Sequence, residues 1–169
     1  MTRLRQGLEF AVVNERLLLR GVIHRRTPAA FADVLAENPQ LRRVVLQQMQ
    51  GAGDTGAVLA MGRLLRAAQL DTALQSDSDL HGDAVFLFAA GGQRRMVQGA
   101  QIHLGGWATP DFARTPEAGL TRSYLVDMLG QAGFLNFALQ ASAGGGIHTM
   151  TAREIAQHGL LTAPVTVFE

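Results

Sequence analysis

Four ionisable side chains of the sequence lie where they could together perform acid–base chemistry. Asp79, His81 and Asp83 surround the start of a predicted short apolar helix, and His103 lies on a later predicted strand. Histidine titrates near neutral pH, and a neighbouring carboxylate can orient its ring and stabilise its charged form. We therefore consider an acid–base site in which His103 is the base and Asp83 or His81 is its partner.

The same side chains also have interpretations that need no catalysis. Asp79 and Asp83 are the residue type expected beside a helix start, where aspartate caps backbone N–H groups and complements the helix dipole. His103 lies on a predicted strand that is followed by a leucine and two glycines. A histidine in that position is also expected as a core or edge residue whose ring is hydrogen-bonded within the fold. His81, Asp83 and His103 also form a chemically reasonable set of metal ligands. Their spacing does not favour a metal specifically, and we expect neither a metal nor a cofactor.

Hydrophobic patterning predicts an α/β domain in which helices connect parallel strands. The first two strands form a hairpin, and a glycine-rich turn at 50–56 opens a helix. A polar turn is expected at 76–79, and a capping box is expected at Thr151 and Glu154. The predicted strands are 8–13, 17–23, 44–46, 70–74, 95–97, 101–104 and 165–168, and the predicted helices are 29–38, 55–68, 81–90, 121–141 and 152–158.

The composition excludes several classes of function. The chain has 169 residues and a formal net charge of +1, which gives no electrostatic case for a nucleic acid or membrane partner. Every cation is an arginine, so lysine Schiff-base chemistry and a phosphate-binding P-loop are excluded. The absence of cysteine excludes disulfides and thiolate ligands. No apolar segment is long enough for a membrane span or a signal-peptide core, so we expect a cytoplasmic protein as the sequence stands, or an exported one if a signal peptide was removed.

Four stretches of the chain follow one another in an informative order. A strand leads into the glycine turn, an apolar helix is followed by an arginine pair, and a later strand precedes a C-terminal helix and strand. The stretches are Val44 to Gly53, Ala84 to Gly91, Gly99 to Ile102 and Met150 to Thr162. In order and spacing they resemble the Clp-protease/crotonase superfamily, and most closely small bacterial Clp-type serine peptidase relatives. The resemblance implies an α/β fold of repeated β-β-α units in a single domain over residues 1–169.

The resemblance also assigns positions to the Ser, His and Asp of the family's triad. These positions fall on Gly82, Gly105 and Ile147, whose side chains cannot act as nucleophile, base or acid. The resemblance therefore implies a catalytically degenerate protein that serves as a binding or assembly module, and it leaves open whether the chain is an enzyme.

The alternative is a hydrolase or a crotonase-type acyl enzyme with a rebuilt site. Its acid–base groups would be Asp83, His81 and His103, and its oxyanion hole would lie at Gly53. In either case the resemblance implies a ligand cleft, whose residues would be Gly51, Gly53, Gly82, Gly105, Ile147 and Trp107. Trp107 is equally well explained as the anchor of its own loop.

The resemblance further implies self-association, because superfamily members assemble as trimers or larger rings. We expect a homo-oligomer of that kind, or a hetero-oligomer with an active paralogue. We expect neither a nucleic acid nor a membrane as partner.

Overall fold

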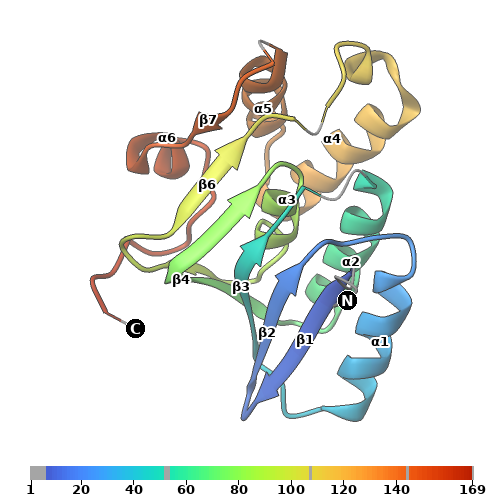
Figure 1. Cartoon of the computed structure of the whole chain (residues 1–169), viewed down its shortest axis with the longest axis vertical. Helices are drawn as coiled ribbons and strands as arrows, with labels where there is room; N and C mark the ends of the chain where they lie inside the picture. Colours follow the sequence, from blue (N-terminus) through green and yellow to red (C-terminus); the bar gives the residue numbers. More distant parts are fainter. Residues whose placement is uncertain (1–6, 52–53, 107, 144, 169) are drawn as a thin grey trace, which may run out of the picture.

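A computed structural model of the chain describes residues 7–51, 54–106, 108–143 and 145–168 (Figure 1). Its sheet has the strand order β1-β2-β3-β4-β6-β7, and β5 also pairs with β4. The strands are β1 (Leu8–Val13), β2 (Arg16–Gly21), β3 (Arg43–Met49), β4 (Asp71–His81), β5 (Arg94–Met96), β6 (Gln101–Leu104) and β7 (His148–Thr149). The helices are α1 (Thr27–Glu37), α2 (Thr55–Ala67), α3 (Ala84–Phe88), the 3₁₀ turn η1 (Phe112–Arg114), α4 (Pro116–Leu129), α5 (Gly133–Ala143) and α6 (Ala152–Gln157).

The centre of the sheet is parallel. Strands β2, β3, β4 and β6 run in one direction, whereas β1 and β7 run antiparallel to their neighbours at the two ends. The predicted hairpin is confirmed as β1 and β2. Parallel strands place their carboxyl ends at the same edge of a sheet, so the segments that follow β3, β4 and β6 come together there.

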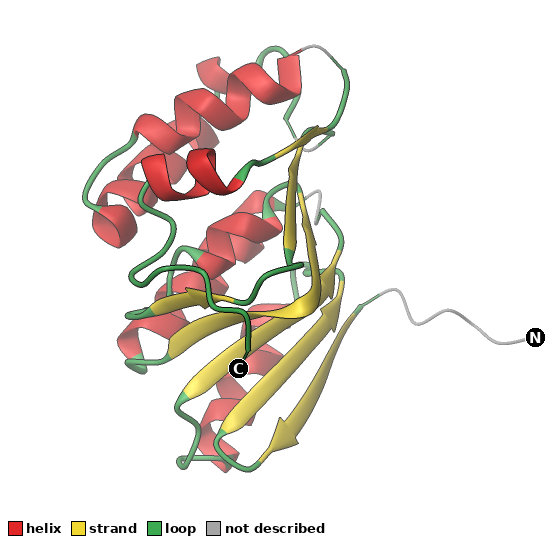
Figure 2. Ribbon diagram, turned by 90° about the vertical axis from the view of Figure 1, so that its left-hand side faces the viewer, coloured by secondary structure: helices red, strands yellow, loops and turns green. Residues whose placement is uncertain are grey.

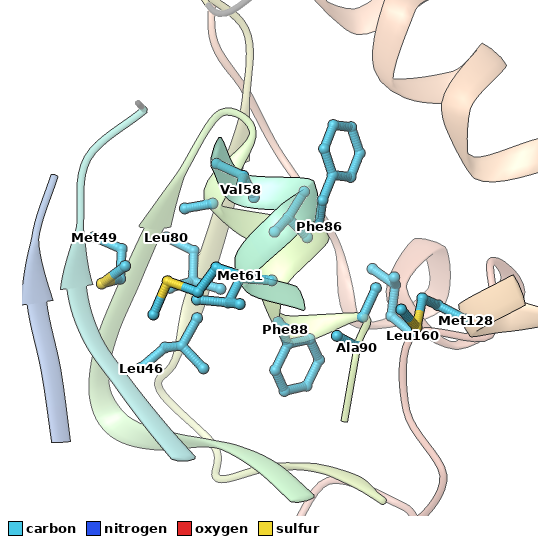
Figure 3. Packing of buried hydrophobic residues seen from close by; sticks show 14 of the residues in the cluster. Leu46, Met49, Val58, Met61, Leu80, Phe86, Phe88, Ala90, Met128 and Leu160 are labelled. Carbon is cyan, nitrogen blue, oxygen red and sulfur yellow. The ribbon is translucent and has the colours of Figure 1, made fainter. Parts of the chain in front are cut away.

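The hydrophobic core lies between the sheet and helices α1 to α3, which cover one side of it (Figure 2). Leu46 and Leu80 from the strands lie beside Val58 and Met61 of α2 (Figure 3). Phe86 of α3 points away from these strand residues, and its ring meets that of Phe134 of α5 edge-on at a centroid distance of 6.1 Å. Successive strand residues point to opposite faces. The neighbours of these buried strand residues therefore face away from the helices. None of the described helices has the length and apolar character needed to cross a membrane.

The polar segment 76–79, predicted to be a turn, lies inside strand β4. The pairing with β3 shifts there, from Leu46 opposite Leu74 to Gln48 opposite Asp79. The Ser78 hydroxyl accepts a hydrogen bond from the Gln75 N–H at 2.8 Å and donates one to the Leu46 carbonyl at 2.5 Å. The turn prediction was wrong because this hydroxyl satisfies backbone groups within the irregularity, and the strand then continues to His81.

The predicted helix 121–141 is two helices. Thr115, not Thr121, caps α4, since its side chain accepts a hydrogen bond from the Ala118 N–H. Gly130 ends α4 with a φ of 79°, a left-handed conformation that favours glycine. The helix predicted at 81–90 is shorter, with residue 81 still in β4. The strand predicted at 165–168 is reduced to one bridge between Val97 and Thr166.

Two glycines within helices allow a matched test of this packing. Gly62 of α2 is buried, and an added methyl group would overlap the Tyr124 hydroxyl, which donates a 2.6 Å hydrogen bond to the Phe86 carbonyl. Gly119 of α4 is exposed, and a methyl group there would meet nothing within 4 Å. We expect Gly62→Ala to lower the free energy of unfolding by about 1–3 kcal/mol through overpacking. We expect Gly119→Ala to raise it by up to about 1 kcal/mol through helix propensity.

Equilibrium urea unfolding of both variants beside the parent chain measures these changes. A Gly62→Ala variant as stable as Gly119→Ala would contradict the packing of α2 against Tyr124.

Candidate functional site

Strand β4 presents two polar side chains on the sheet face that points away from the helices. Asp79 and His81 are two residues apart in the strand and lie on either side of Leu80, which is fully buried in the core. Their side chains remain partly exposed, at 39% for Asp79 and 31% for His81. The site therefore depends on the irregularity at Ser78, which determines the face that these residues occupy.

His103 of β6 completes a cluster with these two residues. It lies directly opposite His81 in the parallel pairing, and the two rings stack with centroids 4.5 Å apart. Each ring approaches a different oxygen of one carboxylate. Asp79 Oδ1 is 2.6 Å from His103 Nε2, and Asp79 Oδ2 is 3.0 Å from His81 Nε2.

The electrostatics of the cluster favour an ionised Asp79. Partial burial raises the pKa of this carboxyl, but the hydrogen bonds from His81 and His103, together with the electrostatic attraction of these rings, outweigh burial and hold the pKa below its ordinary value. An ionised carboxylate only accepts hydrogen bonds. In the absence of other ligands, both Nε2 atoms therefore carry a proton and donate to Asp79.

The two histidines differ in their second nitrogen. His103 Nδ1 lies 2.7 Å from the Thr149 hydroxyl of β7, so both of its nitrogens have protein partners. His81 Nδ1 has no hydrogen-bond partner among the described residues. Sequence reasoning missed Thr149, because a two-residue strand that pairs with β6 across 46 positions leaves no local pattern in the sequence.

Of the two expected partners of His103, His81 lies beside it, but Asp83 lies elsewhere. It is fully buried, and the Thr55 hydroxyl donates a 3.0 Å hydrogen bond to its Oδ2. It thereby joins the loop before α3 to the start of α2. The expected role of Asp79 as a helix cap was also wrong, since Asp79 lies in a strand and is the carboxylate that meets both imidazoles.

Of the residues expected to line a ligand cleft, the four that the structure describes lie in the loops beside the cluster. Gly51 faces the 81–83 turn, because a methyl group added to it would lie 3.6 Å from the His81 carbonyl oxygen. Gly82 has a φ of 62°, and its N–H donates to the His103 carbonyl at 2.9 Å. This amide is therefore already used within the fold. Gly53 and Trp107 lie outside the described residues.

Gly105 and Ile147 lie against each other in two neighbouring loops. A methyl group added to Gly105 would lie 3.2 Å from the Ile147 Cα. Ile147 is 69% exposed, so it does not fill the core. Its side chain also carries no ionisable group. His148 is one residue further along, but it pairs with Glu154 of the confirmed capping box and does not join the cluster.

No protein-family model matches the chain, and no curated protein matches its sequence. Solved structures do match it. One from Pseudomonas aeruginosa is 20% identical with a TM-score of 0.56, over 99% of this chain and 80% of the other. An enoyl-CoA hydratase from Bacillus anthracis is 13% identical with a TM-score of 0.61, over 96% of this chain and 71% of the hydratase. A methylmalonyl CoA decarboxylase is 12% identical with a TM-score of 0.60, over 96% of this chain and 69% of the decarboxylase.

At these identities the likeness shows the fold alone. It confirms the expected α/β fold of the crotonase type. The finer expectation, a closer likeness to Clp-type serine peptidases with a degenerate triad, has no support from these neighbours, which include enzymes named as enoyl-CoA hydratases.

The different burial of the two aspartates predicts different effects on stability. Asp83→Ala leaves the Thr55 hydroxyl without its partner in a buried position, so we expect it to lower the free energy of unfolding by about 1–3 kcal/mol. Asp79→Ala removes hydrogen bonds that water can replace, and we expect a change of about 1 kcal/mol or less. Urea unfolding at neutral pH measures both. A larger loss for Asp79→Ala would show that the cluster is a structural element.

Proposed function

We propose that the chain is an enzyme of acyl-carbonyl chemistry, with His81 as its acid–base group and Asp79 as the residue that positions it. The substrate class that we propose is an acyl thioester. Two of the structures that share the fold are named for acyl groups on coenzyme A, which supports this choice over a peptide.

One observation carries the proposal. His81 has one ring nitrogen fixed by a carboxylate and the other without a partner among the described residues. This is the arrangement by which a carboxylate selects the tautomer of a catalytic histidine and stabilises the imidazolium that forms. The expectation that His103 is the base is revised, because Asp79 and Thr149 occupy both of its nitrogens.

The surroundings of His81 are suited to a carbonyl substrate. His81 ends β4, and its backbone carbonyl lies against Gly51, where the glycine-rich loop after β3 begins. We propose that backbone N–H groups of this loop, which contains Gly53, stabilise the negative charge that develops on the thioester oxygen. His81 Nδ1 would then remove a proton from the carbon next to the carbonyl and return one to product.

This function replaces the binding or assembly module expected from the triad positions. That expectation rested on Gly82, Gly105 and Ile147, which carry no reactive group. The cluster of Asp79, His81 and His103 supplies ionisable groups at the same edge of the sheet, from strand residues and not from the start of α3. The oligomeric state remains a separate proposal, and the acid–base site uses residues of one chain.

Proton exchange provides the most direct test. The chain is incubated in D₂O with a panel of saturated and α,β-unsaturated acyl-CoA thioesters, and deuterium at the α-carbon and hydration of the double bond are followed by NMR. Because general acid–base catalysis contributes about 10²- to 10⁴-fold, we expect His81→Gln to lower the rate by that factor. We expect Asp79→Asn to lower it to a smaller extent, and the matched control His24→Gln to leave it unchanged.

Circular dichroism of each variant shows whether it is folded. The proposal is overturned if the parent chain catalyses neither exchange nor hydration of any thioester in the panel. It is also overturned if the His81→Gln variant is as active as the parent. Turnover of fluorogenic peptides by the parent chain, lost in His81→Gln, would keep the acid–base site and reject the thioester.

A further inference from the structure

The three side chains of the cluster also form a set of metal ligands. The ligand atoms of Asp79, His81 and His103 all lie within 4.8 Å of one another, and this is the one such group among the residues that the structure describes. It contains two imidazole nitrogens and one carboxylate. Such a set suits the divalent transition cations, whereas Mg²⁺ and Ca²⁺ prefer ligands that are all oxygen.

The backbone holds these ligands in place without a metal. Asp79 and His81 are on the same face of β4, and the pairing with β6 places His103 directly opposite His81. Both Nε2 atoms already point at the carboxylate, at 3.0 Å and 2.6 Å. A tetrahedral cation with bonds of about 2.0–2.2 Å needs its ligand atoms about 3.3–3.6 Å apart, so these atoms must separate by about 0.3–1 Å to admit it.

Thr149 supports the cluster from outside the ligand set. In many metal sites the second ring nitrogen of a ligating histidine donates a hydrogen bond, which fixes the tautomer and leaves the other nitrogen free to bind the metal. The Thr149 hydroxyl lies 2.7 Å from His103 Nδ1 and can accept such a hydrogen bond. His103 then offers the lone pair of Nε2 to the cation, in place of the hydrogen bond that Nε2–H otherwise donates to Asp79.

The charge and the exposure of the cluster also favour a bound cation. One carboxylate and two neutral imidazoles bring one negative charge to a divalent cation. The side chains are 14–39% exposed, so a hydrated cation can reach them from solvent. Three protein ligands also leave at least one coordination position for water or substrate.

From these observations we infer that Asp79, His81 and His103 bind one Zn²⁺-class divalent cation. This site goes beyond the proposed acyl chemistry. The cation takes the two Nε2 atoms, so the ring proton of His81 moves to Nδ1 and this nitrogen can no longer act as the base.

Binding is tested with the metal alone. Isothermal titration of tag-free protein with ZnCl₂, and the visible absorption of added Co²⁺, are expected to show one equivalent per chain, and Mg²⁺ to show none. We expect Asp79→Asn, His81→Gln and His103→Gln each to abolish this saturable binding. Because outer partners of ligands typically contribute about 10- to 100-fold in affinity, Thr149→Val is expected to weaken binding by that factor.

The matched control is His148→Gln, which removes the other histidine–carboxylate pair of the described chain and is expected to bind as the parent does. If a ligand variant does not fold, the imidazole NMR signals of the parent still decide, since Zn²⁺ must shift those of His81 and His103. The inference is overturned if the parent does not bind one equivalent of Zn²⁺, or if all three ligand variants bind it as tightly as the parent. It is also overturned if Zn²⁺ shifts only the signals of His148.

No substrate is present in these measurements. A missing metal site would therefore leave the acyl chemistry standing, and a chain that is inactive towards thioesters could still bind Zn²⁺.

Discussion

Strand β4 pairs with β3 over two stretches that are separated by an irregularity at 75–78, and the Ser78 hydroxyl joins the two strands there. The irregularity also divides the other edge of β4. Residues 72–74 pair with β5, and residues 79–81 pair with β6. One strand thus pairs with two different parallel neighbours along the same edge. Since side chains alternate with a period of two, the number of residues in this irregularity decides whether Asp79 and His81 or Leu80 face the helices.

Local rules predicted the parts of the fold that local chemistry controls. The hairpin of β1 and β2, the start of α2 after the glycine-rich turn and the Thr151–Glu154 capping box all depend on residues close in sequence. The polar segment at 76–79 looked like a turn for the same local reason. The Ser78 hydroxyl instead accepts from the Gln75 N–H and donates to the carbonyl of Leu46, which is 32 residues away and which no local pattern indicates.

The candidate site was predicted only in part, again because spacing along the sequence does not show which distant residues meet. His81 and His103 were identified, because histidines are few and these two flank the glycine positions of interest. Which aspartate joins them could not be decided by spacing, since Asp79 and Asp83 are equally close to His81 in the sequence. The end of β4 at His81 separates them. Asp79 stays on the exposed face of the strand, and Asp83 turns into the interior, where the Thr55 hydroxyl compensates part of its burial.

The shared carboxylate limits what the cluster can hold. Asp79 brings one negative charge to two rings whose centroids are 4.5 Å apart, so it compensates one imidazolium while a second would repel the first. A single divalent cation between the three ligands avoids that repulsion, because both rings are then neutral and donate lone pairs to the same centre. The cluster is therefore suited to one added proton or to one cation, and not to both. The proposed proton transfer at His81 and the proposed metal binding are for this reason alternatives at one site.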